Sequence, residues 1–285
     1  MNKKQNPMST MEPWDLVASG YAETTMLIFE QFAEAAITAA ELKPDATVLD
    51  VACGPGTLGL KAAPAVDKVH GIDFSQSMLD CFARRIAQEG HRNIEIRHGD
   101  AQALPFEDDT FDAAFSLFGL MFFPDRGKGF AEIHRTLKPG GVATVTSWAP
   151  VNQSPAMQMM FGALRTIKPE IPEPQRAIDT LENPERFAQE MRDAGFTNIS
   201  IRSVTGAFPV ESVTGFWNDL VKGGAPLQLM KKAMGEALWK EKEKLAIAFL
   251  EEQLPTTPTT LSSDAWLGVG VKAHEDPAYY IGEGC

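Results

Sequence analysis

The fold of this chain is decided by residues 46–59, which read ATVLDVACGPGTLG. The stretch begins as a short apolar run with β-branched residues, which is the composition of a buried parallel strand. Glycines then interrupt the run, and residues 58–63 are typical of the start of a helix. A strand, a glycine turn and a helix in this order predict the opening unit of a dinucleotide-type α/β sheet.

The glycine turn has the spacing Gly54-x-Gly56-x-x-Gly59. Glycine has no Cβ, so the backbone can turn sharply there and lie close to a ligand. The spacing alone is not specific, because structural turns and nicotinamide sites match it as well. Asp50, four residues before Gly54 at the end of the expected strand, makes the pattern more informative.

Residues 48–56, VLDVACGPG, closely resemble the first motif of the class I S-adenosylmethionine-dependent methyltransferases. The glycine that usually stands two places after the acid is replaced here by alanine, which takes a positive φ less easily. The resemblance is nearest to the branch of quinone-biosynthesis and small-molecule enzymes (methyltransferase type 11). It implies that the first strand and the glycine turn contribute five cofactor-binding residues, Asp50, Ala52, Cys53, Gly54 and Gly56.

Length and composition limit the class of protein. The 285 residues suit a core domain of typical size plus an insertion or a small second lobe. No apolar run approaches the ~20 residues that span a bilayer. Residues 1–7 are not followed by the apolar core of a signal peptide. Three cysteines do not make a disulfide framework, so we expect a cytoplasmic protein in a reducing compartment.

The formal net charge of −12 argues against nucleic acid as the main partner, because phosphate contacts need a basic surface. It also disfavours anionic membrane surfaces. The five histidines show no metal-ligand spacing, so we expect no metal site. The expected partner is a small-molecule substrate, and the sequence does not indicate an oligomeric state.

The N-terminal segment, residues 1–42, is expected to close on the cofactor. Residues 1–12 are polar and predicted to be disordered, and residues 14–42 are predicted to be helical. The expected apolar face of that helix consists of Leu27, Ile28, Phe32, Ala35, Ala36 and Ala39. Trp14 and Tyr21 stand where related enzymes carry a closing segment. Each either packs against the domain edge or, as we expect of Tyr21, contacts the ligand.

The second expected strand, residues 68–74, contains Asp73 about twenty residues after the start of the glycine turn. At that spacing a carboxylate accepts hydrogen bonds from ribose hydroxyls. The alternative is a helix cap, because a helical pattern follows. Ser75 is itself cap-like, which favours the ligand role for Asp73. Phe74 and Met78 then flank the adenine, or else belong to the core.

The third expected strand, residues 94–98, is followed by GDAQALPF at residues 99–106, which matches the third-strand motif of the same family. The resemblance implies that Asp100 accepts a hydrogen bond from the exocyclic amine of adenine. It also implies that the backbone N–H of Ala101 donates to a ring nitrogen. The alternative is an aspartate that only shapes a turn.

The fourth expected strand, residues 111–119, leads to the reacting centre. Ligands bind beyond the carboxyl ends of parallel strands, so Ser116 and the residues up to Gly119 should border the transferred methyl. The Asp/Asn-Pro-Pro-aromatic motif of enzymes that methylate nucleobase or glutamine nitrogens is missing here, which counts against those substrates. A helix over residues 126–137 follows, in which His134 is expected to be a surface or packing residue.

The rest of the chain predicts the architecture and an insertion. The core is expected at residues 43–149, completed by residues 184–208 and 263–273, while residues 274–285 form a tail. The resemblance implies an α/β fold: a doubly wound, seven-stranded, mostly parallel sheet whose last strand is antiparallel. Residues 150–183 and 209–262 are expected to form a helical lid over the substrate.

The acceptor pocket is expected to be apolar. Its predicted lining is Phe118, Met121, Phe122 and Trp148, with Met157, Met160, Phe161, Phe216 and Trp217 from the lid. The alternative is that these lid residues form the core of the lid itself. An apolar lining predicts a small hydrophobic or aromatic acceptor.

The reaction implied by the resemblance is SN2 transfer of a methyl group from S-adenosylmethionine. We assign no catalytic residue, because a base is needed only if the nucleophile arrives protonated. One alternative is an NAD(P)-dependent oxidoreductase, which leaves Asp50, Asp100 and the turn at residues 138–141 without a role. The other is a non-catalytic S-adenosylmethionine-binding regulator, against which the large lid argues.

Overall fold

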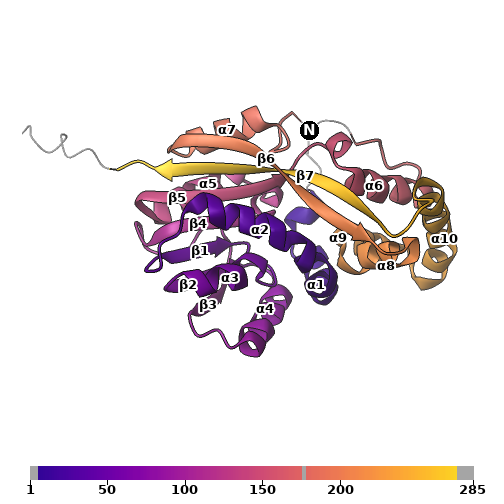
Figure 1. Cartoon of the computed structure of the whole chain (residues 1–285), viewed down its shortest axis with the longest axis horizontal. Helices are drawn as coiled ribbons and strands as arrows, with labels where there is room; N and C mark the ends of the chain where they lie inside the picture. The colour runs from indigo at the N-terminus through magenta and orange to yellow at the C-terminus, as the bar shows by residue number, and fades with distance from the viewer. Residues whose placement is uncertain (1–5, 175–177, 275–285) are drawn as a thin grey trace, which may run out of the picture.

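The computed structural model describes residues 6–174 and 178–274. Its centre is a seven-stranded sheet with the strand order β3-β2-β1-β4-β5-β7-β6 (Figure 1). Strands β1 to β5 pair in parallel, whereas β7 runs antiparallel to both β5 and β6. This is the predicted fold class. The strands are β1 (Thr47–Val51), β2 (Lys68–Asp73), β3 (Ile94–His98), β4 (Phe111–Leu117), β5 (Leu137–Trp148), β6 (Phe196–Val210) and β7 (Thr259–Lys272).

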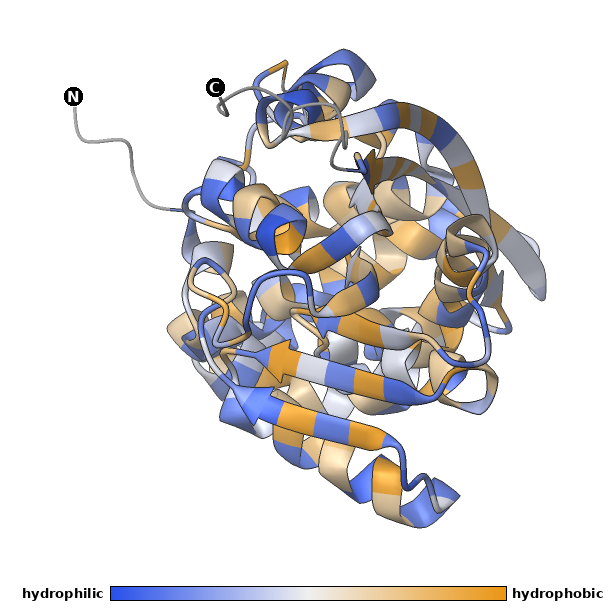
Figure 2. Cartoon of the chain, turned by 90° about the vertical axis from the view of Figure 1, so that its left-hand side faces the viewer, coloured by the Kyte–Doolittle hydropathy of each residue, from blue (hydrophilic) through white to orange (hydrophobic). Residues whose placement is uncertain are grey.

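Alternating side chains of β1 divide the core between the two faces of the sheet, since successive residues of a strand point to opposite faces. Leu49 and Val51 pack with residues of α5 (Arg126–Thr136) and α7 (Pro184–Asp193). Val48 packs on the other face with α2 (Met26–Ala40) and α3 (Thr57–Ala62). Figure 2 shows hydrophobic residues running through the strands, while the loops at their ends are mostly hydrophilic.

The strands after residue 137 are the longest of the sheet. Residues 138–141, which directly follow the helix expected over residues 126–137, belong to β5. Strand β6 ends at Val210, which pairs with Thr259 at the start of β7. Residues 209–210 and 259–262 of the expected 209–262 insertion are therefore part of the sheet. Strands β6 and β7 extend past the other strands to the region where α6, α8, α9 and α10 lie (Figure 1).

The helices of the expected lid are α6 (Pro155–Ile167), α8 (Val213–Gly223), α9 (Ala225–Met234) and α10 (Glu236–Gln253). Helices α9 and α10 are separated by Gly235, whose φ of 76° favours glycine. The described residues between 168 and 183 contain no helix, so the helical parts described in that expected lid segment are α6 and a short 3₁₀ turn at Val151–Gln153. Helix α4 (Gln76–Glu89) completes the set.

The N-terminal segment is helical almost throughout. Helix α1 (Glu12–Gly20) continues through a π-helical turn at residues 21–25 into α2. The expected apolar face was wrong at Leu27, which is 67% exposed. The buried face instead follows the helical spacing of Met26, Phe29, Phe32, Ala33, Ala36 and Ala40.

Residues 6–12 are ordered, contrary to the predicted disorder, and residues 1–5 lie outside the described part. A short 3₁₀ turn at Pro7–Ser9 is capped by the side chain of Asn6. The backbone O of Met8 accepts a hydrogen bond from Trp14 Nε1 at 2.9 Å, and Ser9 Oγ donates to the backbone O of Phe122 at 2.6 Å. These contacts hold the start of the chain against the loop after β4.

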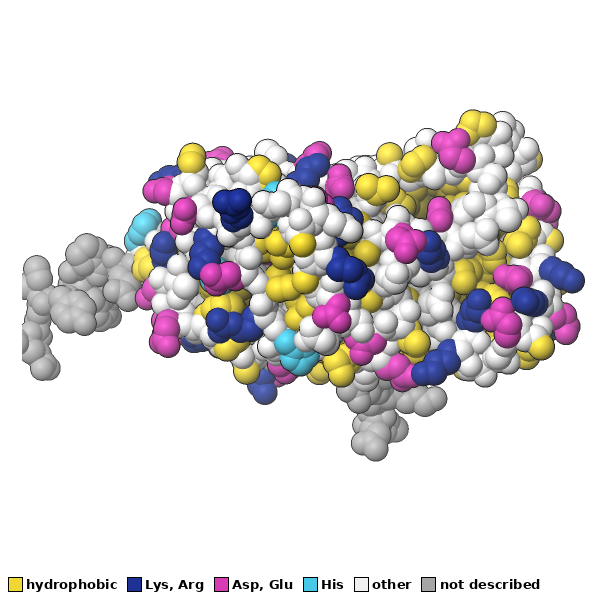
Figure 3. All heavy atoms as spheres, turned by 90° about the horizontal axis from the view of Figure 1, so that it is seen from below, with side chains coloured by type: hydrophobic (Ala, Val, Ile, Leu, Met, Phe, Trp, Pro, Cys, Tyr) yellow, Lys and Arg dark blue, Asp and Glu magenta, His cyan; other side chains and the backbone are white. Residues whose placement is uncertain are grey.

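The surface carries charges of both signs. Acidic and basic side chains are interspersed on the face in Figure 3, so the net negative charge is not gathered there. Within the two described ranges, no helix is long and apolar enough to cross a membrane. The same residues contain no group of three or more His, Cys, Asp or Glu that could hold a metal ion.

Candidate active site

A cavity of about 690 Å³ opens beyond the carboxyl ends of β1 to β5. Such clefts at strand ends are where open α/β sheets bind their ligands. All four predicted acceptor residues line it: Phe118, Met121, Phe122 and Trp148. Ten of the twelve predicted cofactor residues also line it, namely Tyr21, Asp50, Ala52, Cys53, Gly54, Asp73, Phe74, Met78, Asp100 and Ala101. Their binding roles remain predictions.

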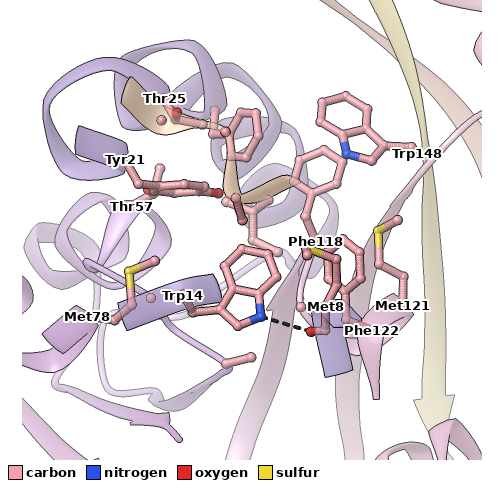
Figure 4. A pocket seen from close by; sticks show the side chains of 18 of the residues that line it. Met8, Trp14, Tyr21, Thr25, Thr57, Met78, Phe118, Met121, Phe122 and Trp148 are labelled. Atoms are coloured by element: carbon pink, nitrogen blue, oxygen red, sulfur yellow. Dashed lines mark hydrogen bonds between the residues drawn. The ribbon is translucent and has the colours of Figure 1, made fainter. Parts of the chain in front are cut away.

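We call the part lined by Asp50, Cys53, Gly54, Asp73, Phe74, Met78, Asp100 and Ala101 the cofactor half. We call the part lined by Phe29, Phe118, Met121, Trp148, Phe161, Phe208 and Phe216 the acceptor half. Figure 4 shows Tyr21, Thr57 and Met78 on one side of the cavity and the labelled residues of the acceptor half on the other.

Asp50, at the end of β1, has one satisfied and one open oxygen. Its Oδ2 accepts a hydrogen bond from the backbone N–H of Gly59 at 3.0 Å, at the start of α3. No described group donates to Oδ1, although the residue is only 1% exposed. Burial, with a smaller contribution from the charge of Asp73, raises the pKa of Asp50 to about 8. An open, buried carboxylate oxygen fits a ligand that carries a cationic amino group.

Asp73, at the end of β2, ties the glycine turn to the next helix. Its Oδ2 accepts from Gly54 N–H at 2.8 Å and its Oδ1 from Ser75 N–H at 2.8 Å. The cap of α4 is Ser75, whose Oγ accepts from Met78 N–H, so Asp73 is not the helix cap. Burial raises the pKa of Asp73 to about 6, against the lowering effect of these N–H donors. Each carboxylate oxygen retains a lone pair for the ribose hydroxyls predicted from the sequence.

Asp100 follows β3 and shapes a turn while facing the cavity. Its Oδ1 accepts from the backbone N–H of Gln102 at 2.8 Å and from Gln102 Nε2 at 3.1 Å. These contacts are those of an aspartate that shapes a turn, which was the alternative interpretation. Asp100 and the buried Ala101 nevertheless both line the cofactor half, so the adenine role stays a prediction.

The glycine turn contains a residue in an unfavourable conformation. Ala52 has a φ of 55°, which lies in the left-handed region that the Cβ of alanine disfavours. Such a conformation costs about 1–2 kcal/mol. The next residue, Cys53, is 6% exposed and donates its N–H to Ile72 O at 3.0 Å. Burial, together with the charges of Asp50 and Asp73, raises the pKa of the Cys53 thiol, so it remains protonated.

The N-terminal segment covers the cofactor half. Ser75 Oγ donates to Asp15 Oδ1 at 2.6 Å, which fastens α1 to the start of α4. Tyr21 lies in the π-helical turn, a feature frequent at functional sites. Burial and the nearby charge of Asp73 raise the pKa of Tyr21, so its hydroxyl stays neutral. Tyr21 both lines the cavity and packs edge-on against Phe29 with ring centroids 5.7 Å apart, so its contact with the ligand stays a prediction.

The acceptor half is an aromatic cluster built from distant segments. Phe118 stacks on Trp148 with ring centroids 4.2 Å apart, and it lies 4.8 Å from Phe29. Phe208 of β6 lies 6.5 Å from Trp148. Phe161 and Phe216 reach the cavity from α6 and α8. Met157 and Met160 also line it, as predicted for the lid.

Three predicted residues do not line the cavity. Ser116 is 1% exposed, and its Oγ accepts the N–H of Leu120 at 3.1 Å, so it braces the turn after β4. Gly56 faces inward, because a Cβ there would lie 2.2 Å from the Phe82 ring. Trp217 is fully buried and stacks on Trp239 at 6.0 Å. For Trp217, the alternative of a lid core is correct.

Several residues of the cavity wall were not predicted. They include Met8, Ser9, Thr24, Thr25, Phe29, Thr57 and Phe208. Phe29 lies one turn after Met26 on the buried face of α2, and that spacing was a usable signal. Nothing in the sequence indicated that Met8 would reach the cavity, since its place depends on the loop after β4. His134 lies elsewhere: it packs edge-on against Phe196 at 5.0 Å, as expected of a packing residue.

The chain is similar to known methyltransferases. A family model described as a methyltransferase domain matches residues 48–141. The chain is 35% identical over 172 residues to a demethylmenaquinone methyltransferase of Staphylococcus aureus strain JH9, covering 55% of this chain and 70% of that protein. The chain belongs to the class I S-adenosylmethionine-dependent methyltransferases. Its resemblance to the quinone-biosynthesis branch is thereby confirmed.

Solved structures show the same fold. The YcgJ protein of Bacillus subtilis aligns with a TM-score of 0.55 at 20% identity, over 85% of this chain and 98% of that chain. A phosphoethanolamine N-methyltransferase of Haemonchus contortus, solved with phosphomonomethylethanolamine and S-adenosylhomocysteine, aligns with a TM-score of 0.54 at 20% identity. That alignment covers 85% of this chain and 52% of the other.

Family membership defines the cofactor as S-adenosylmethionine and the chain as a transferase. The residues present fit that cofactor, since the open Oδ1 of Asp50 suits its amino group and Asp73 retains acceptor capacity. The oxidoreductase and the non-catalytic regulator are not favoured.

Proposed function

We propose that this methyltransferase acts on a small, largely apolar molecule that contains an aromatic ring. The observation that carries the proposal is the acceptor half, where rings from six separate elements or loops face one cavity. Aromatic side chains bind flat rings by offset or edge-on stacking. The demethylmenaquinone methyltransferase of Staphylococcus aureus, to which the chain is similar, agrees in its name with an acceptor of this class.

The methyl transfer mainly requires the protein to position the donor and the acceptor. When bound, the cofactor supplies an activated methyl group on a sulfonium. Asp50 and Asp73 hold the donor at the strand ends, and the acceptor half aligns the nucleophile with it. The N-terminal segment and α8 line the cavity and exclude water from it. Such alignment can supply ~7–11 kcal/mol of the barrier. No described histidine lines the cavity, so we assign no general base.

The test follows radioactive methyl groups into a cell extract. The purified chain is incubated with tritiated S-adenosylmethionine and an extract, and the products are divided between an organic and an aqueous phase. The proposal expects enzyme-dependent label in the organic phase, with release of S-adenosylhomocysteine. Label confined to polar products in the aqueous phase would contradict it.

Two variants sharpen the assay. Trp148→Ala opens the acceptor half and should lower the transfer rate strongly. Phe106→Ala removes a partly buried ring that packs on His70 and Phe111, outside the cavity. It should lower stability while leaving transfer per folded molecule unchanged. Equal losses in both variants would remove the link between the aromatic wall and the acceptor.

A further inference from the structure

Two cavity-lining residues share an unusual backbone conformation. Five non-glycine residues of the described ranges have a positive φ. Glu41, Asp109 and Asn198 lie outside the cavity wall, whereas Ala52 (φ 55°) and Phe118 (φ 57°) lie in it. A bulky residue such as phenylalanine rarely takes this conformation unless its surroundings enforce it.

The turn at Phe118 is held from two sides by hydroxyl groups. Phe118 N–H donates to Thr146 Oγ1 of β5 at 2.9 Å. Leu120 N–H donates to Ser116 Oγ at 3.1 Å. Both hydroxyl residues are almost fully buried. These bonds fix the backbone before and after Gly119.

The third side of the turn is closed by the methyl group of Ala52. A Cβ added to Gly119 would lie 2.4 Å from Ala52 Cβ, whereas its next neighbour, Ser116 Oγ, would be 3.3 Å away. The Ala52 methyl therefore rests against the Gly119 backbone. With glycine at position 52, this space would be open. Because Ala52 directly precedes Cys53 and Gly54, the contact joins the cofactor half to the acceptor half.

We propose that the Ala52 methyl group is a positioning element that holds the Phe118–Gly119 turn, and with it the Phe118 ring, in place for the acceptor. The inference rests on the proposed function. The contact defines the distance between the glycine turn and the ring that stacks on Trp148. Ala52 thus acts on the acceptor through Phe118.

The variant Ala52→Gly separates this role from cofactor binding. It relieves the positive φ, so the chain should fold and its Kd for S-adenosylhomocysteine should stay within about twofold. Its Kd for 1-naphthol, an aromatic probe of the acceptor half, should rise by about 3- to 10-fold, the effect of one disturbed stacking contact. Glu41→Gly is the matched control, because it relieves a positive φ (49°) at the exposed end of α2 and should change neither Kd.

The reciprocal variants test the contact itself. Gly119→Ala places two methyl groups at 2.4 Å, so it should displace the turn, lower the Tm and weaken 1-naphthol binding. The double variant Ala52→Gly/Gly119→Ala moves the methyl group to the other side of the contact. It should recover the 1-naphthol Kd to within about threefold of the parent, because substitutions of touching residues couple.

The outcomes are distinct. An unchanged 1-naphthol Kd in Ala52→Gly, or an equal loss of S-adenosylhomocysteine affinity, overturns the proposal. A double variant no better than Gly119→Ala alone also overturns it. These are binding measurements, so they stand whatever the turnover assay returns. Absence of organic-phase product alongside the expected binding pattern would reject the proposed reaction and leave the positioning role supported.

Discussion

The cofactor half and the acceptor half differ in how their residues are spread along the chain. The cofactor half comes from residues 50–101, where the lining residues lie at the carboxyl ends of β1, β2 and β3 or in the segments that follow these ends. The acceptor half draws Phe29 from α2, Phe118 and Trp148 from two strand ends, and further rings from β6, α6 and α8. One half is a local product of strand and turn; the other exists only after the whole chain has folded.

The two halves are also stabilised differently. In the cofactor half, buried carboxylates accept backbone N–H groups: Asp50 from Gly59, and Asp73 from Gly54 and Ser75. In the acceptor half, rings pack on rings without directional bonds between them. Hydrogen-bonded sites lose function when one atom is removed, whereas packed sites lose it gradually. The following predictions test this contrast.

The largest effect is expected on the support of the cofactor half. Gly56→Ala forces a side chain into the left-handed region (φ 92°) and to 2.2 Å from the Phe82 ring. The two effects together should lower the free energy of unfolding by about 2–5 kcal/mol. Urea unfolding measures it. Gly90→Ala is the control, since Gly90 has a similar φ of 73° and a Cβ added there would have no neighbour within 4 Å. This variant should lower the free energy of unfolding by only about 1–2 kcal/mol. Equal losses would show that packing on Phe82 is unimportant.

Next in size is removal of the Asp73 carboxylate. Asp73→Ala should weaken S-adenosylhomocysteine binding by about 1.5–3 kcal/mol, the range of a hydrogen bond to a charged group. Binding of 1-naphthol should not change, because Asp73 belongs to the cofactor half. Isothermal calorimetry gives both affinities. Asp112→Ala removes a carboxylate that pairs with Lys138 outside the cavity, so it should leave both intact. Unchanged cofactor affinity in Asp73→Ala would end the ribose assignment.

A pH dependence should appear in one half only. The pKa of Asp50 is raised by burial to about 8, so below that pH its neutral form prevails and must lose a proton to meet a cationic amino group. Between pH 6, below which Asp73 also takes up a proton, and pH 8, affinity for S-adenosylhomocysteine should therefore rise with pH by up to about tenfold per unit, and it should level off above pH 8. Affinity for 1-naphthol should stay flat over the same range, and Asp50→Asn should remove the slope for the cofactor. A flat cofactor profile in the parent chain would contradict the role of Asp50.

The same raised pKa affects stability in the opposite direction. Between the unfolded pKa near 4 and the folded pKa of about 8, the folded Asp50 binds more protons than the unfolded residue. The Asp50 contribution to the free energy of unfolding must therefore fall as pH rises through this window. Comparing urea unfolding of the parent and Asp50→Asn across this range checks the sign: the parent should lose stability relative to the variant.

The contrast between the halves also explains what the sequence could predict. Asp50, Asp73 and Asp100 could be predicted to line the cavity because each lies at or just after the carboxyl end of a short strand, at a spacing that the family shares. Phe118, Met121, Phe122 and Trp148 were found by the same rule, since they follow β4 or end β5. Residues that reach the cavity from other elements, such as Met8 and Phe208, have no local signature.

The errors have physical reasons of the same kind. Ser116 precedes the turn after β4, and the alternation of the strand turns its hydroxyl inward to Leu120 N–H. The ends of β6 and β7 are held by pairing with each other, from Val210 opposite Thr259, so neither end could be read from its own residues. Ala52 adopts a positive φ, although alanine takes this conformation less easily than the glycine that usually stands there.

The smallest expected effect concerns the packed half. Trp148→Phe keeps an aromatic ring but removes part of the surface that stacks on Phe118 at 4.2 Å. Binding of 1-naphthol should weaken by about 0.5–1.5 kcal/mol, the worth of one aromatic pair, while S-adenosylhomocysteine affinity stays unchanged. Trp239→Phe is the matched control, because Trp239 packs in the lid core and its indole N–H has no described partner. It should lower stability alone. If Trp148→Phe instead abolished binding of the probe, the acceptor half would depend on a directional contact of the indole, and the contrast between a bonded half and a packed half would fail.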